Sequence, residues 1–117
     1  MKTIIMTLFL IPLMAWAATA PTQMGQTDYC KQALEHIQAA VTAGEQGNAK
    51  GLVKHAEAGL EQAKMAQKPK SSKDVDEAID SLEQAIKLGK SGEVAKATER
   101  AKASAEYIDA AVAALGG

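Results

Sequence analysis

The sequence predicts an all-α protein, an up-down-up-down four-helix bundle built from two repeated helical hairpins over residues 28–115. Apolar residues recur along this stretch at spacings of three and four, which is the period of a helix with one buried face. Alanine, the strongest helix former, is abundant. Loops of about four or five residues separate the periodic segments, and such short loops make consecutive helices antiparallel neighbours.

The N-terminal residues 1–17 have the three-part pattern of a secretory signal peptide. Lys2 supplies the positive charge, an apolar run from Ile4 to Ala15 follows, and small residues complete the segment. The apolar run is too short to span a bilayer comfortably. We therefore expect an exported protein, located in a bacterial periplasm, with no stable membrane insertion after processing.

Two cleavage sites compete within this segment. Ala15-Trp16-Ala17 predicts cleavage after residue 17, and Ala18-Thr19-Ala20 offers residue 20 as the alternative end. Cleavage after residue 20 would place Pro21 just after the broken bond, which disfavours it. Residues 18–27 contain proline and glycine without any periodicity, which indicates a flexible leader.

The first hairpin is predicted from residues 28–43 and 49–67. Thr27 or Asp28 can cap the first helix, and Gly44 is placed to end it in the left-handed conformation. Asn48 is the predicted N-cap of the second helix. Within that helix Gly51 and Gly59 each cost up to about 1 kcal/mol relative to alanine, and Lys68-Pro69-Lys70 ends it.

The second hairpin is predicted from residues 72–88 and 92–115. Ser71 and Asp74 have the spacing of a capping box, and Gly89 is expected to end the third helix. The fourth helix ends at the chain's last two glycines.

An internal repeat relates the two hairpins. Residues 33–63 align without gaps on residues 78–108, a shift of 45 positions. The alignment places the two GxxG turns, 44–47 and 89–92, over one another. It therefore favours duplication of a helical hairpin.

Composition excludes several functions. Basic and acidic residues number 13 and 14, and aromatic residues are only 3% of the chain, so it lacks the basic face and stacking rings of a nucleic-acid binder. One cysteine rules out an internal disulfide framework. In an oxidising periplasm, Cys30 is a candidate for an intermolecular disulfide that would give a homodimer. No catalytic constellation is present, so an enzyme is not expected.

Histidines are the most informative polar residues. The chain has two, His36, eight residues before Gly44, and His55, eight residues after Gly47. An antiparallel hairpin turning at these glycines places both imidazoles at the same height, about 12 Å from the turn. Neutral imidazole is a good ligand for copper, nickel and zinc.

The rotation of the two helices decides which way these histidines point. If Leu34 and Val53 belong to the central pairs of the seam, both histidines point outward. If Ile37 and Ala56 lie nearest the bundle axis, both histidines flank the seam on the same side and can converge.

A convergent pair would form a weak, open site with one carboxylate in support. Glu35 and Glu57 are the preferred candidates for that carboxylate. Haem is not expected, because C-x-x-C-H is absent and the histidines do not sit near opposite ends of the core. A ferritin-like centre is also disfavoured, because neither histidine has a glutamate three residues before it.

The first hairpin resembles a known family. The phrases ALEHIQAA and GNAKGLVKHAEAGLEQA, with the GEQG turn between them, are similar to the repeats of the small metal-binding protein family of bacterial periplasms. The resemblance covers about residues 28–115 and is best in the first hairpin. It implies an exported helical bundle that binds divalent metals such as copper, nickel and zinc.

Members of that family owe their metal binding to many histidines, whereas this sequence keeps His36 and His55 and has Ser81 and Arg100 at the repeat-related positions. The resemblance therefore implies reversible metal buffering with the metal weakly held. The alternative is a helical interaction module that has lost metal binding.

Overall fold

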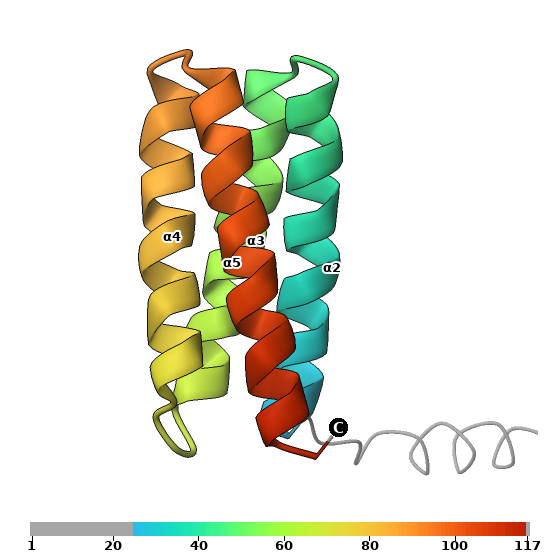
Figure 1. The fold of residues 1–117 in the computed structure, drawn as a ribbon, viewed down its shortest axis with the longest axis vertical. Coiled ribbons are helices and arrows are strands. Elements are labelled where there is room, and N and C mark those ends of the chain that lie inside the picture. The colour runs from blue at the N-terminus through green and yellow to red at the C-terminus, as the bar shows by residue number, and fades with distance from the viewer. Residues whose placement is uncertain (1–24, 117) are drawn as a thin grey trace, which may run out of the picture.

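The computed structural model describes residues 25–116, which form four antiparallel helices packed side by side (Figure 1). The predicted fold class, an all-α four-helix bundle, is confirmed. The predicted signal peptide and nearly all of the predicted leader lie outside the described residues. The helices are α2 (Gln26–Glu45), α3 (Ala49–Gln67), α4 (Lys73–Lys90) and α5 (Val94–Ala114).

The helices occupy the corners of a square, with α2 and α4 each lying beside both α3 and α5. The α2–α3 and α4–α5 turns lie at one end of the bundle, and the α3–α4 loop lies at the other end, where α2 begins and α5 ends (Figure 1). Among the described helices, none combines the length and apolar character needed to span a membrane.

The core is aliphatic and rich in alanine, as its stripe pattern predicts. Its largest fully buried apolar side chains are few and come from all four helices. Small side chains fill the remaining space, which lets the helices approach closely. The larger members are Ile37, Leu52, Leu82, Ile108, Val75 and Cys30, and buried alanines include Ala33, Ala40, Ala56, Ala63, Ala78, Ala85, Ala97 and Ala101.

The two hairpin turns end in glycines other than the predicted ones. Gly47 and Gly92 adopt the left-handed conformation, with φ of 75° and 87°. The N–H of Gly47 bonds the carbonyl of Gly44 at 3.0 Å, and the next N–H, of Asn48, reaches back to Ala43 at 2.8 Å. This is the Schellman arrangement. The prediction that Gly44 ends its helix is therefore wrong, because the helix continues to Glu45 and buries Gly44.

The second turn repeats the first. The N–H of Gly92 bonds Gly89 at 3.1 Å, and the N–H of Glu93 bonds Leu88 at 2.9 Å. Gly89 is buried inside α4 rather than ending it, and α5 begins at Val94, two residues later than predicted. The repeat in the sequence is thus also a repeat in backbone conformation.

Two predicted helix starts are corrected. α2 begins at Gln26 with Gly25 as N-cap, because the Gln26 amide donates to the carbonyls of Ala66 and Lys70 and ties this turn to the end of α3. Asp28 accepts the Gly25 N–H at 3.2 Å and so lies in the first turn rather than at the cap.

The other correction concerns α4. Its N-cap is Ser72 rather than Ser71, and the Ser72 hydroxyl accepts the N–H of Val75. The Gln67 side chain accepts the Ser72 N–H at 2.8 Å, which fixes the cap one position later than the sequence pattern suggests. For α3, the predicted bounds and the Asn48 cap are confirmed, with the Asn48 side chain accepting the Gly51 N–H at 2.9 Å.

Candidate metal centre

His36 lies on the side of α2 that faces α3. A methyl group added at Gly59 of α3 would come 3.5 Å from the His36 Cβ and 3.1 Å from the Ile37 Cγ1. The root of the His36 side chain therefore lies directly beside the α3 backbone. The residue is half-buried, so it lies at the edge of the α2/α3 seam rather than in the core.

His55 lies on the matching side of α3. Gly51, His55 and Gly59 follow one another at intervals of four residues and so share one face of the helix. Both glycines of this stripe face α2, since a Cβ at Gly51 would lie 3.2 Å from the Ala43 Cβ and Gly59 faces His36. His55 lies between them, half-buried, and so also faces the α2/α3 seam.

Of the two orientations left open by the sequence, the burial pattern agrees with the one in which both histidines flank the α2/α3 seam. Leu34 and Val53 are only partly buried and pack against the core from its edges, whereas Ile37 and Ala56 are fully buried. Both histidines flank the same seam on the same side.

Their heights differ from the prediction. His36 is beside Gly59, which is four residues beyond His55, so the histidines are offset by about 6 Å along the helices. The reason is the position of the turn. The turn comprises residues 46–48 rather than 44–47, which places His36 opposite positions 58 and 59 instead of opposite His55.

The two candidate carboxylates lie elsewhere. Glu35 is exposed on the neighbouring outer face of α2. Glu57 pairs with Lys90 of α4, with 3.6 Å between the Oε2 and Nζ atoms, and so lies toward the α3/α4 side of the helix. Neither carboxylate is thus held beside the histidines, and no group of three or more His, Cys, Asp or Glu side chains suited to a metal occurs within residues 25–116.

Gln62 is a seam residue that the sequence analysis did not single out. It follows His55 by seven residues, two helical turns, and therefore lies on the same face of α3. Its side-chain oxygen Oε1 is buried without a hydrogen-bond partner, and it is the one such side-chain atom found in the described part of the chain. A water or an ion bound beside such an oxygen would satisfy it. The seven-residue spacing from His55 was the available sequence signal.

Cys30 is fully buried in the core, facing away from solvent. Burial raises the pKa of its thiol, because the charged thiolate loses its solvation. A disulfide with a second copy would therefore require the start of α2 to open. The homodimer linked through Cys30 stays a prediction.

The fold and the seam define a small all-α bundle whose two imidazoles line one helix pair. The model of the small metal-binding protein family matches residues 1–111 of the sequence. The chain therefore belongs to the small metal-binding protein family. No curated protein matches the sequence.

Proposed function

We propose that this protein is an exported metal buffer that reversibly binds a divalent transition-metal ion, copper, nickel or zinc, at the α2/α3 seam. Membership of the small metal-binding protein family supports metal binding in general. The observation that carries the proposal for this seam is that both histidines of the chain flank it on the same side.

Imidazole chemistry gives the mechanism of binding. The neutral ring offers one nitrogen lone pair to a borderline-soft cation, and two such rings arranged along one seam can bind a single ion. The offset of about 6 Å between His36 and His55 along the helices is the distance that the two side chains would have to bridge to hold one ion. The remaining coordination positions would belong to water.

The side chain of Gln62 bears on whether the α2/α3 seam can hold a cation. Its buried Oε1 atom has no donor to accept from, and an amide oxygen can either ligate a cation or accept the N–H of a ligating imidazole. Either role would satisfy the oxygen. The residues present therefore fit an ion, but with few strong ligands.

The small number of ligands explains why we propose buffering rather than tight storage. Within residues 25–116 no carboxylate completes a three-ligand group with the two histidines, and Glu57 is already paired with Lys90, so little negative charge would neutralise the ion. The ion would exchange readily with the solution. The activity proposed is coordination, not catalysis, and it takes place in the periplasm after removal of residues 1–17.

The test is calorimetric titration of the untagged, metal-free protein with Cu²⁺ and with Ni²⁺. The matched comparison is the His36→Ala/His55→Ala double variant, which contains no histidine. The control is Glu57→Gln, which removes a carboxylate turned toward α4. We expect saturable binding by the native protein and by the control, and loss of that binding in the double variant.

Equal heats for the native protein and the double variant would refute binding at this seam. If neither protein gave saturable heat, the bundle would be a scaffold that has lost metal binding, and the interaction-module hypothesis would replace the present one. Loss of binding in Glu57→Gln would instead place the site on the α3/α4 side.

A further inference from the structure

The repeat assigns a counterpart to the histidine seam in the second hairpin. A shift of 45 residues carries Gly51 to Lys96 and His55 to Arg100 on α5. It carries Ala39 and Ala43 of α2 to Gln84 and Leu88 of α4. The first hairpin thus has Gly51 and His55 where the second hairpin has the cationic residues Lys96 and Arg100.

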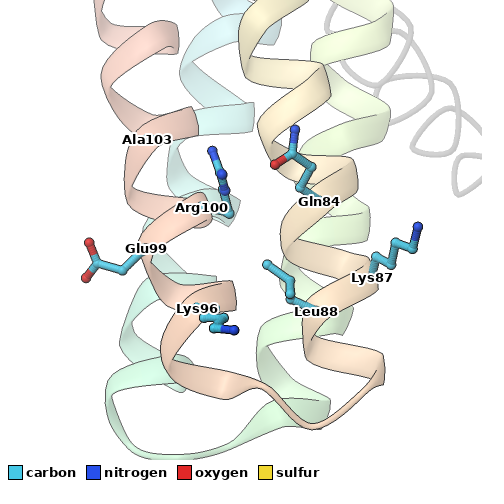
Figure 2. Close-up of a pocket in the computed structure, with 7 residues that line it drawn as sticks. All are labelled: Gln84, Lys87, Leu88, Lys96, Glu99, Arg100 and Ala103. Atoms are coloured by element: carbon cyan, nitrogen blue, oxygen red, sulfur yellow. The ribbon is translucent and has the colours of Figure 1, made fainter.

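This counterpart is an open groove of about 620 Å³ between α4 and α5. Figure 2 shows Arg100 at the α4-facing edge of α5 and Lys96 one turn from it on the same helix, with Gln84 and Leu88 opposite on α4. Lys87 and Glu99, also at the groove, point away from it (Figure 2). The groove interior therefore combines two cationic groups with an apolar wall formed by Leu88 and Ala103.

The acidic residues near the groove leave Arg100 without a partner. Glu99 pairs with Lys102 on its outer side, at 3.9 Å. Asp80 accepts the amide of Gln84 at 3.0 Å. Within residues 25–116, Arg100 makes no ion pair with any carboxylate, so its planar set of five donors is available to an outside anion.

Lys96, unlike Arg100, already has an ion-pair partner. Its Nζ atom lies 3.0 Å from a carboxylate oxygen of Glu93, the N-cap residue of α5. A ligand in the groove would share Lys96 with Glu93, while Arg100 would be its main anchor. Lys96 and Arg100 are one turn apart, about 6 Å along α5, so a ligand with two anionic ends could reach both.

We propose that the α4/α5 groove binds a small organic dicarboxylate. Arg100 would hold one carboxylate through paired N–H donors, a geometry that guanidinium and carboxylate share. Lys96 would attract the second carboxylate, and Leu88 and Ala103 would pack against the short carbon chain between them. An inorganic anion would gain nothing from that apolar wall.

Binding would be weak, because both cationic side chains are exposed to solvent. We expect a dissociation constant in the millimolar range, about 4 kcal/mol of binding free energy. The site is independent of the histidine seam, which lies on the other hairpin, so it can exist whether or not the protein binds metal.

The test is titration of the metal-free protein with succinate, followed by amide chemical shifts in ¹H–¹⁵N spectra. Acetate, phosphate and chloride at equal ionic strength are the comparison ligands. We expect saturable shifts confined to the groove for succinate, weaker binding of acetate and phosphate, and none of chloride.

Three variants sharpen the test. Arg100→Gln should weaken succinate binding at least tenfold. Lys102→Gln, which removes a cation on the opposite side of α5 that pairs with Glu45 and Glu99, should leave it unchanged. Glu93→Gln should strengthen binding two- to threefold, because it releases Lys96 from its present partner.

Several results would overturn the proposal. Amide shifts that rise linearly with the concentration of any salt would mean that the groove has no anion-binding site. Succinate-induced shifts that Arg100→Gln leaves unchanged would mean the same. Saturation by phosphate but not by succinate would refute the dicarboxylate assignment. Since all measurements use metal-free protein, none of these outcomes depends on the metal-binding proposal.

Discussion

Gly44 of α2 lies directly against Thr98 of α5, so closely that a Cβ at Gly44 would overlap the Thr98 hydroxyl oxygen. The same relationship recurs 45 residues on, where a Cβ at Gly89 would come 2.7 Å from the Cγ2 of Val53. Gly89 and Thr98 are the repeat partners of Gly44 and Val53. The two hairpins therefore pack on one another with approximate twofold symmetry, each burying a glycine of its first helix against the second helix of the other.

Gly44→Ala should destabilise the bundle. The added methyl group would also lie 2.8 Å from the Leu52 Cδ1, so neighbours on two helices must move. Such overpacking costs about 1–3 kcal/mol, which exceeds the roughly 1 kcal/mol that alanine gains over glycine inside a helix. Urea unfolding followed by circular dichroism measures the difference.

Combining Gly44→Ala with Thr98→Ala should recover part of this loss, because the second change removes the overlapping oxygen. A Gly44→Ala protein as stable as the native one would show that α2 and α5 can separate at no cost, contrary to the packing described.

Gly47→Ala and Gly92→Ala should each lower stability by about 1–2 kcal/mol, the cost of the left-handed conformation for a residue with a Cβ. A Cβ at either position would meet no atom within 4 Å, so the backbone alone causes the loss. Thermal unfolding of the two variants measures it. Gly47→Asn should lose less, since asparagine tolerates this conformation, and equal losses for alanine and asparagine would contradict that explanation.

Gln62→Leu should raise the stability of the metal-free protein by about 1 kcal/mol, because it removes a buried oxygen that has no partner. The same change should weaken metal binding if the oxygen serves the ion or its imidazole ligand. Urea unfolding and calorimetry measure the two effects separately. Gln38→Leu, at an exposed position of α2, is the control and should produce neither effect.

Metal binding should depend on each histidine and on pH. His36→Ala and His55→Ala should each reduce affinity for Ni²⁺ at least tenfold, since each removes one of two imidazole ligands. Affinity of the native protein should fall on acidification, because protons compete with the metal for imidazole nitrogen. Calorimetry at pH 7.5 and pH 5.5 tests this, and unchanged affinity at the lower pH would exclude imidazole ligation.

Cys30 should react slowly with thiol reagents in the native protein and rapidly in urea, since its side chain is fully buried. A disulfide-linked dimer on a non-reducing gel should appear only after the protein has been opened. Fast reaction of the native protein would show that the start of α2 opens readily.

The raised pKa of Cys30 gives a pH prediction for stability. In the unfolded chain the thiol loses its proton near its usual pKa of about 8.5. In the folded protein the buried thiol keeps its proton to a higher pH. The thiol's contribution to stability is therefore complete below about pH 8.5 and is lost as the pH rises further. Cys30→Ser should lack this part of the pH dependence in unfolding experiments carried out between pH 7 and pH 10.

Much of the architecture could be predicted from the sequence. The apolar period and the short loops predicted four antiparallel helices, and Asn48 and Lys68-Pro69 predicted the bounds of α3 correctly. These signals are local, since a cap or a proline acts on its own turn of backbone. The two histidines could likewise be identified from the sequence as candidate metal ligands, because residue chemistry does not depend on the fold.

Other features depended on the tertiary structure. A GxxG turn contains two glycines, and the local sequence does not show which of them adopts the left-handed conformation. In the structure Gly47 does so, whereas Gly44 packs against Thr98, where a side chain would not fit. The position of this turn also sets the register of α2 against α3. That register offsets His36 from His55 along the α2/α3 seam, which Gln62 shares. Helical periodicity determines which residues share a face, but only the packing of neighbouring helices determines which residues of two faces meet.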